Sequence, residues 1–385
     1  MPELTPNATQ SLLGLKVVEM GSSVAAPYAA WILASLGADV IKVERPGAGD
    51  DARHWGQMFE DGSSTYFHAL NRDKRGITVD LTDQSDRQWL RDFCINEADV
   101  VIQNMRPGSI DKYGLGATDL RAANPKLIYC NLWAFGHTGP MKNKPGYDPL
   151  MQAYGGLMSV TGHKGDAPIR VGTSIVDMGT GLWSAIGILS ALKHRTDTGK
   201  GCLVDTSLYE TSVAWMSIVS STVQVDGQAP EKQGSGAGGI APYQAYECSD
   251  GHLIIAAPND SLFEKLAGVL GHPEWSSDPR FNSNINRFQN LSVLNELIEP
   301  ELKQHPRSHW RDAFDQVSLP TAPVQDIPEM INDPQTEALG IIQSLAKNSP
   351  DLMGMPLSFN GERPPLRRYA PKLGEHNDEI KGNKS

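Results

Sequence analysis

Short apolar runs alternate with longer, partly apolar segments along the first 135 residues, a pattern typical of α/β proteins. Runs at 15–20 and 38–44 predict strands. The intervening segment 25–37 predicts a helix, because Pro27 suits a first helical turn and Gly37 suits the position after a last one. A strand, a helix and a strand in this order form a right-handed βαβ unit.

The same alternation continues beyond the first unit. It predicts further helices at 85–98 and 178–194, and further strands at 76–81, 99–104, 126–135 and 202–208. Strands that alternate with helices favour an open parallel sheet covered on both faces. We therefore predict an α/β protein with a Rossmann-like parallel sheet.

The periodic pattern is lost between residues 224 and 242, where Gly, Gln and Lys become frequent. This stretch predicts a linker and a Gly-rich loop. We expect residues 1–223 to form the N-terminal part of a large domain and 243–320 to form a small α+β domain. Residues 321–385 are expected to return to the large domain and end in a tail.

Composition and charge narrow the possible functions. The 385 residues are 39% apolar and carry a formal charge of −11, from 34 basic and 45 acidic side chains. An acidic chain is a poor candidate for binding nucleic acid or a membrane surface. Four widely spaced cysteines and no recognisable ligand spacing disfavour a disulfide framework or a metal site. The N-terminus lacks the pattern of a signal peptide, so we expect a cytoplasmic protein or one in an organelle matrix.

Local motifs exclude several enzyme classes and leave one candidate chemistry. The first βα turn, 21–27, contains only Gly21 where a dinucleotide-binding turn needs three glycines. There is no G-x-S-x-G elbow, no P-loop and no H-E-x-x-H. Basic residues near predicted strand ends either form solvated surfaces or receive a ligand with several phosphates. These residues are Arg45, Arg53, Arg72, Lys74, Arg75, Arg106 and Lys112.

Asp177 lies just before a predicted helix whose first turn contains Gly179 and Gly181. One interpretation is an N-cap, which stabilises a helix by roughly 1 kcal/mol. The other is a carboxylate kept ionised by the positive end of the helix, and such a group is a nucleophile toward an activated acyl group. The glycines would then let a bulky substrate approach. The local sequence leaves both interpretations open.

Seven segments in the same order nevertheless resemble one family, the class III CoA-transferases. The group contains formyl-CoA:oxalate CoA-transferase, carnitine CoA-transferase and the α-methylacyl-CoA racemases. The resemblance covers the chain nearly end to end. The segments are LLGLKVVEM with AAPYAAWILASLGADVIKVERPGAGDDAR, NRDKRGITVDL, NMRPGSIDKYGLG, NPKLIYCNLWAFGHTGP, GYDPLMQAYGGLMSVTG, PIRVGTSIVDMGTG and LGEHNDEI.

The resemblance implies a mechanism and a catalytic residue. The catalytic aspartate of the family falls on Asp177, which would form a mixed anhydride with an acyl group and then an aspartyl-CoA thioester. A Gly-rich lid over that aspartate matches GSGAGG at 234–239, so Gly236, Gly238 and Gly239 are the expected lid residues. Coenzyme A is the implied co-substrate, and no metal is implied.

The resemblance also implies CoA contacts and an assembly. Val24 falls near the acyl end of CoA. The residues expected at the adenine and phosphates are Arg45, Asn71, Lys74, Asn104, Arg106 and Lys112. Family members form interlocked homodimers, with a large domain built from both termini. We therefore expect this chain to be a homodimer.

The GYD segment separates the transferases from the racemases of this fold. Racemases carry a histidine base where this chain has Tyr147, and tyrosine is a poor base at neutral pH. Tyr147 is instead either a hydroxyl near the acceptor acid or a packed aromatic residue. ERPGAGDDAR and IAPYQAY are similar to transferases of small dicarboxylates. CoA transfer to such an acid is the favoured function, with an acyl-CoA racemase or isomerase as the alternative and a CoA-binding regulatory protein as a third hypothesis.

Overall fold

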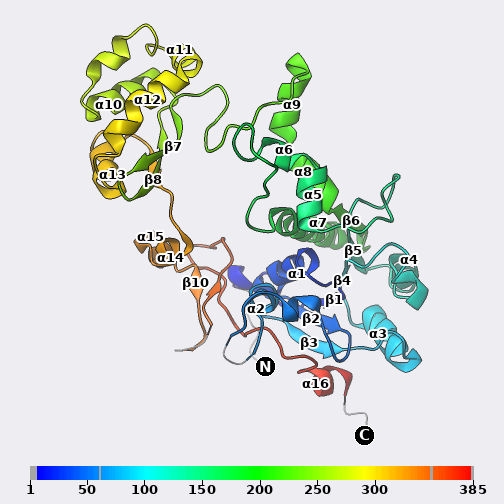
Figure 1. Ribbon diagram of the computed structural model, residues 1–385. Coiled ribbons are helices and arrows are strands. Elements are labelled where there is room, and N and C mark those ends of the chain that lie inside the picture. Colours follow the sequence, from blue (N-terminus) through cyan, green and yellow to red (C-terminus); the bar gives the residue numbers. More distant parts are fainter. Residues whose placement is uncertain (1–6, 60–61, 347–349, 383–385) are drawn as a thin grey trace. The chain divides into compact units, whose positions relative to one another are not determined.

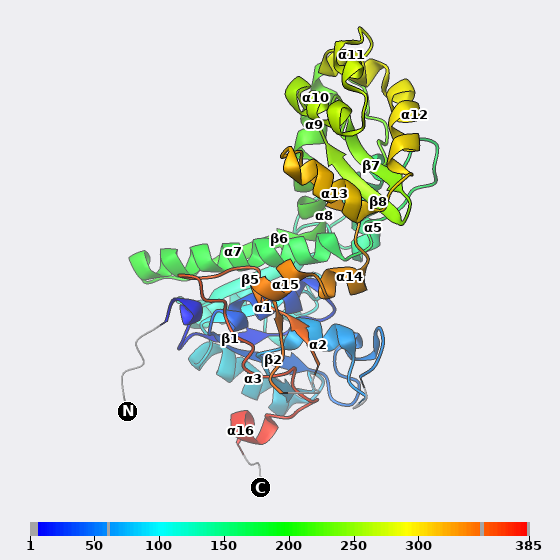
Figure 2. The same ribbon diagram turned by 90° about the vertical axis from the view of Figure 1, so that its left-hand side faces the viewer.

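A computed structural model describes residues 7–59, 62–346 and 350–382, and the chain divides into two compact units (Figures 1 and 2). The first unit contains Met1–Leu157, Arg170–Val225 and Pro334–Ser385. The second contains Met158–Ile169 and Asp226–Asp333. The first unit therefore uses segments from both halves of the chain, and a short excursion at 158–169 belongs to the second.

A six-stranded parallel sheet forms the centre of the first unit, which confirms the predicted α/β class. Its strands are β1 (Lys16–Glu19), β2 (Asp39–Glu44), β3 (Arg75–Thr78), β4 (Val100–Gln103), β5 (Ile128–Trp133) and β6 (Leu203–Ser207). The spatial order β3-β2-β1-β4-β5-β6 is that of doubly wound nucleotide-binding sheets. The order reverses between β1 and β4, and ligands of such sheets bind outside the carboxyl ends of the strands at that point.

Helices cover both faces of the sheet because its strand residues alternate between two apolar cores. Val17 and Val100 belong to the core shared with α1 (Ala25–Ser35) and α7 (Ile175–Thr198). Their neighbours Val18 and Val101 belong to the core shared with α3 (Gln84–Asn96) and α4 (Ala117–Ala123). Figure 2 shows α1 and α7 on one side of the strands and α3 on the other.

Helix α7 is the longest helix of the described chain, with 24 residues. Its length and composition alone would let it cross a membrane, but one face of the helix packs against α1 and the sheet. Gly181 permits the contact with α1, because a Cβ there would lie 2.7 Å from the carbonyl oxygen of Ala25. The helix ends at Thr198, beyond the predicted 194, and is followed by Gly199, whose φ of 72° is readily adopted only by glycine.

Shorter elements complete the first unit. They are α2 (Thr65–Asn71), α5 (Asp148–Tyr154), α8 (Leu208–Trp215), α9 (Ser217–Asp226), α15 (Pro334–Leu339), α16 (Asn377–Lys381) and the antiparallel pair β10 (Ile342–Gln343) and β11 (Leu352–Met353). Helix α6 (Leu157–Val160) begins at the last residue of this segment of the first unit and continues into the second unit. Single 3-10 turns are η1 (Ala8–Gln10), η2 (Asp51–His54) and η3 (Asp111–Tyr113). The four cysteines are free thiols, as expected.

The second unit has its own antiparallel sheet and apolar core. Strands β7 (Tyr243–Cys248), β8 (Gly251–Ala256) and β9 (Thr321–Pro323) form the sheet, so β9 extends it beyond residue 320, where we expected the small domain to end. The core contains Phe263, Phe281 and Phe314. The helices are α10 (Asp260–Val269), η4 (Pro273–Ser277), α11 (Asn284–Gln289), α12 (Leu291–Leu302), α13 (Arg307–Gln316) and α14 (Ile327–Ile331).

A fully buried ion cluster lies at the carboxyl end of β1. Glu19 accepts a hydrogen bond from Lys42 Nζ at 3.0 Å and another from Lys74 Nζ at 2.8 Å, and none of the three side chains is exposed. Burial acts to lower the pKa of Lys42, but Glu19 and Asp50 outweigh it and raise that pKa. Burial lowers the pKa of Lys74 to about 8, because Glu19 compensates only in part. Glu19 thus contacts both lysines, and Lys42 also pairs with Asp50 at 2.9 Å.

Glu19→Gln should therefore destabilise the fold. Removing one partner of a buried ion pair typically costs about 3–5 kcal/mol, and here Lys74 would stay buried without a carboxylate partner, whereas Lys42 keeps its pair with Asp50 at 2.9 Å. The measurement is the free energy of unfolding in urea, followed by circular dichroism. The control is Glu97→Gln, which breaks a pair with Lys16 on the surface and should have little effect. Equally small changes in both variants would show that the cluster does not stabilise the protein.

Candidate functional site

Asp177 lies inside the first turn of α7 rather than before the helix, because α7 starts at Ile175 and not at the predicted 178. Ser174 is the N-cap, and its side chain makes no capping hydrogen bond. The interpretation of Asp177 as the N-cap is therefore wrong. The first N–H groups of α7 need another acceptor.

Asp148 provides that acceptor from the start of α5. Its Oδ2 atom accepts hydrogen bonds from the backbone N–H groups of Val176 at 2.8 Å and Asp177 at 3.1 Å. Its Oδ1 atom accepts one from Gln152 Nε2 at 2.5 Å, and Gln152 Oε1 accepts the N–H of Val171 at 2.9 Å. We call the side chains of Asp148 and Gln152, with the backbone of Val171, Val176 and Asp177 that they hold, the Asp148 network. Sequence reasoning missed it because Asp148 and Asp177 are 29 residues apart.

Burial and the nearby Asp148 carboxylate raise the pKa of Asp177 to about 7. The expectation that the helix terminus keeps Asp177 fully ionised at neutral pH is therefore wrong. Desolvation disfavours the charged form, and a like charge adds to the effect. The arrangement instead favours any neutral form of this side chain, whether protonated or acylated.

The two glycines after Asp177 serve helix packing and not substrate access. A Cβ at Gly179 would lie 2.9 Å from the Trp215 side chain and 3.0 Å from that of Thr211. A Cβ at Gly181 would lie 2.7 Å from the backbone of α1. The space beside both residues is already filled by α8 and α1, so the predicted approach route for a bulky substrate is not present there. The glycines instead let α7 lie between two helices, which fixes the position of Asp177.

The first βα turn is fixed by side chains from two other strand ends. Asn104, which follows β4, accepts the N–H of Ser22 at 3.0 Å and donates to the Ser22 carbonyl at 2.8 Å. Asp50 accepts the N–H of Ser23 at 3.0 Å, which helps to hold Ser23 at a φ of 69°. Val24 is buried and starts α1 without a side-chain cap. The turn therefore lies at the point between β1 and β4 where the strand order reverses.

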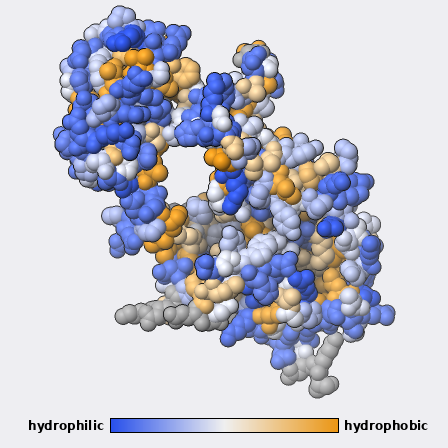
Figure 3. All heavy atoms as spheres, viewed as in Figure 1, coloured by the Kyte–Doolittle hydropathy of each residue, from blue (hydrophilic) through white to orange (hydrophobic). Residues whose placement is uncertain are grey.

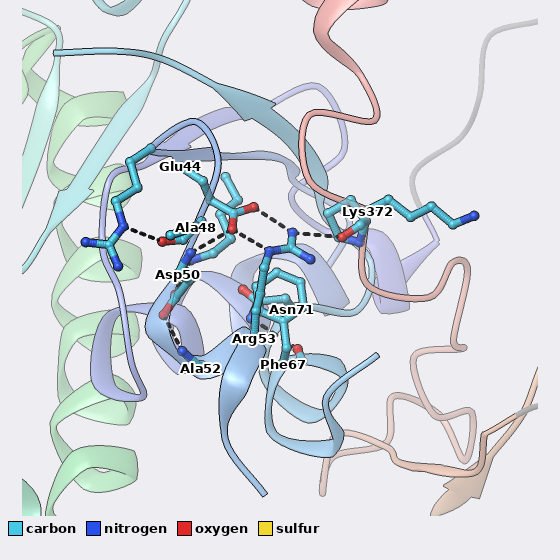
Figure 4. A network of polar contacts seen from close by, with 12 residues as sticks. Glu44, Ala48, Asp50, Ala52, Arg53, Phe67, Asn71 and Lys372 are labelled. Atoms are coloured by element: carbon cyan, nitrogen blue, oxygen red, sulfur yellow. Dashed lines mark hydrogen bonds and ion pairs between the residues drawn. The ribbon is translucent and has the colours of Figure 1, made fainter. Parts of the chain in front are cut away.

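The loop after β2 is fixed from within by Glu44. Figure 4 shows the Glu44 carboxylate between Arg53 and the backbone of Asp50. Arg53 donates to both carboxylate oxygens at 2.7 and 2.8 Å, and the N–H of Asp50 donates at 3.0 Å. Arg53 is therefore occupied by a protein carboxylate and is not free to bind a phosphate.

The predicted CoA-binding side chains fall into a surface group and a buried group. Arg45, Arg106 and Lys112 are exposed, and Arg45 contacts the Gly49 carbonyl and Asp51. Asn71 and Lys74 are fully buried.

Lys74 donates to Glu19, to the Pro27 carbonyl and to Asn71 Oδ1, while Asn71 Nδ2 donates to the Phe67 carbonyl. The hydrogen-bonding groups of both side chains thus contact other protein groups, whereas we expected them to contact CoA. A basic run in a sequence does not distinguish an inward lysine from an outward one.

The expected acceptor and lid residues are also placed by the structure. Tyr147 is the N-cap of α5, directly before Asp148, and the residue is 60% exposed within the single chain. Gly236, Gly238 and Gly239 belong to the second unit. A Cβ at Gly238 or Gly239 would meet no heavy atom within 4 Å. Within the described residues, no group of three or more His, Cys, Asp or Glu side chains could hold a metal ion.

Comparison with known proteins gives a consistent result. CoA-transferase family III matches residues 12–377. A succinate–glutarate CoA-transferase of Agrobacterium fabrum is 35% identical, covering 97% of this chain and 96% of that protein. An acetyl-CoA:oxalate CoA-transferase of Acetobacter aceti is 36% identical, with 97% and 96% covered.

A crystal structure of a CAIB/BAIF family protein from Brucella suis is similar in fold and sequence. Its TM-score to this chain is 0.89 and its sequence identity is 39%, covering 97% of this chain and 99% of that one. The family match spans the described sheet, the Asp148 network and the first βα turn. The chain belongs to CoA-transferase family III and is a CoA-transferase.

Proposed function

We propose that the protein moves CoA from an acyl-CoA thioester to a free dicarboxylic acid, with Asp177 as the covalent carrier. The observation that carries this proposal is the half-buried Asp177 carboxylate, whose pKa is raised to about 7 and whose backbone is held by Asp148. The relatives support the substrate class, because their names specify succinate, glutarate and oxalate, all of which are dicarboxylates.

The reaction proceeds through two activated forms of Asp177. The carboxylate attacks the thioester carbonyl of the donor, which forms a mixed anhydride and releases CoA thiolate. The thiolate then attacks the Asp177 carbonyl, which releases the donor acid and leaves an aspartyl-CoA thioester. The acceptor carboxylate attacks that thioester, which forms a second anhydride and releases CoA thiolate again. The thiolate finally attacks the acceptor carbonyl, which releases the new acyl-CoA and restores Asp177.

The environment of Asp177 suits this sequence energetically. The anhydride and the thioester are both neutral at the aspartyl group, whereas the free carboxylate is charged. Burial and the charge of Asp148 raise the free energy of the ionised carboxylate. The same two effects therefore make the carboxylate more basic and favour its acylation. No ATP is needed, since each step exchanges one activated acyl group for another.

CoA is proposed to bind across the end of the sheet where the strand order reverses. Val24 and the turn held by Asn104 would lie along the acyl end of CoA, while the exposed Arg45, Arg106 and Lys112 would meet the phosphates. Asn71 and Lys74 would act only through the backbone they support.

Tyr147 and the expected lid glycines are proposed to complete the site. The Tyr147 hydroxyl, which is exposed next to Asp148, would donate to the acceptor acid. Gly236, Gly238 and Gly239 would shield the acylated Asp177 from water. Neither role requires a base that removes a proton from carbon, so we do not propose racemisation.

Asp177→Asn should abolish transfer and stabilise the fold. Transfer should fall more than about a thousandfold, because an amide cannot form the anhydride. The folded-state pKa of about 7 lies above the ordinary value of 3.8, so stability falls as pH rises from 3.8 to 7. The asparagine variant has no ionisable group here and escapes this loss. Its free energy of unfolding should therefore exceed that of the wild type by roughly 1–4 kcal/mol at pH 8 and by less at pH 4, since each unit of pKa shift corresponds to about 1.4 kcal/mol.

CoA exchange between labelled acids and thermal unfolding at both pH values measure these effects. Asp312→Asn is the control, because Asp312 is exposed on α13 in the second unit, and it should change neither property. Full transfer activity in the Asp177 variant would refute the role of Asp177 as nucleophile. A loss of stability that is greater at pH 8 than at pH 4 would contradict the electrostatic account.

We also propose that the protein is an interlocked homodimer. Large apolar side chains of α5, α7 and α8 remain 42% to 56% exposed. They are Leu150, Tyr154, Leu182, Trp183, Ile186, Val213 and Trp215. Figure 3 shows apolar residues among polar ones over this part of the first unit. Exposed apolar groups of this number are typical of a surface that another protein chain covers, and the family resemblance indicates a second copy.

An interlocked dimer cannot separate without partial unfolding. Sedimentation of the protein diluted to nanomolar concentration should therefore still give the dimer mass. Mixed samples of tagged and untagged protein should exchange subunits only after denaturation and refolding. A folded, active monomer at nanomolar concentration would contradict the interlocked assembly.

A further inference from the structure

Arg170 is an exposed cation on the segment that leads into α7, and it belongs to the same unit as Asp177. Its Nη1 atom donates to the carbonyl oxygens of Val171 at 3.2 Å and Gly172 at 3.1 Å. Among the described residues, Nε and Nη2 have no acceptor. One side of the guanidinium is therefore fixed to the backbone, and its Nε–Nη2 edge is available to a ligand.

The Asp148 network connects Arg170 to the nucleophile. Val171, the next residue, donates its N–H to Gln152. Gln152 in turn donates to Asp148, which holds the N–H of Asp177. Gln152 and Asp148 are buried, with exposed fractions of 0% and 3%. Arg170 thus extends from the same buried scaffold that positions the reacting carboxylate.

Electrostatic repulsion opposes the binding of a dicarboxylate acceptor at this site. It carries two negative charges toward Asp177, which already lies beside the Asp148 carboxylate. Repulsion between like charges in a partly buried site is strong, so a cation is needed near the acceptor. From residue 165 to residue 177, Arg170 is the only basic residue. Its free edge can bind a carboxylate through two parallel hydrogen bonds.

We propose that Arg170 binds the distal carboxylate of the acceptor acid and so selects dicarboxylates. This inference rests on the proposed function, in which a carboxylic acid accepts CoA from Asp177. With one carboxylate bound to the guanidinium, the other carboxylate is left to attack the aspartyl-CoA thioester. A monocarboxylate of equal length gains nothing from Arg170. Tyr147 adds a neutral donor but does not offset the second charge.

The test compares glutarate with pentanoate, and succinate with butyrate, as acceptors of equal length. Arg170→Gln should lower the ratio of kcat/KM for the dicarboxylate to that for the monocarboxylate about ten- to hundredfold, as expected for the loss of a bidentate charged contact. Arg170→Lys should keep part of the ratio, because the charge remains but the paired geometry is lost. Arg311→Gln, on exposed α13 of the second unit, is the matched control and should leave the ratio unchanged.

A second measurement separates this inference from the proposed function. The dissociation constants of glutarate and pentanoate are measured by NMR on the Asp177→Asn variant with CoA present, with and without Arg170→Gln. Weaker binding of glutarate alone supports the role of Arg170, even if the wild type were found to transfer no CoA. Equal losses for both acids, in binding and in kcat/KM, would instead show that Arg170 only supports the start of α7. An unchanged ratio in Arg170→Gln would also overturn the proposal.

Discussion

The site depends first on the two hydrogen bonds by which Asp148 holds the backbone of Val176 and Asp177. They cap α7, which otherwise starts without a side-chain cap, and they join α5 to α7. They also bring a second carboxylate close to Asp177, and this contact helps to raise its pKa to about 7. One contact therefore stabilises the helix and destabilises the ionised form of Asp177, the charge that the proposed acylation would remove. A single buried aspartate thus links the local fold to the chemistry.

Other contacts in the first unit hold Asp177 and the turn after β1 in position. Close packing of Gly181 against α1 fixes α7, and with it Asp177. The buried cluster around Glu19 holds the end of β1. Asn104 and Asp50 then hold the turn that follows β1, including the strained Ser23. A strained backbone conformation at such a turn persists only where several surrounding contacts hold it. These contacts hold the end of the sheet at which we propose that CoA binds.

The sequence predicted what depends on local patterns and missed what depends on long-range contacts. The six strands lie close to their predicted positions, because buried parallel strands give clear apolar runs. The start of α7 was misplaced because Ser174 caps it without the usual side-chain contact. The inward direction of Lys74 and the role of Asp148 could not be predicted, since both depend on partners distant in sequence. Asp177 was identified through the family resemblance, whereas its raised pKa required the structure.

The most direct test of this account is to trap the covalent intermediate as a function of pH. The enzyme is mixed with succinyl-CoA and quenched with borohydride, and its peptides are analysed by mass spectrometry. The modification should lie on Asp177, and its rate should rise with a midpoint near pH 7, because only the ionised carboxylate attacks. Asp148→Asn should lower that midpoint by removing the neighbouring charge. Modification of a different residue, or a rate on Asp177 that does not change across this pH range, would contradict the account.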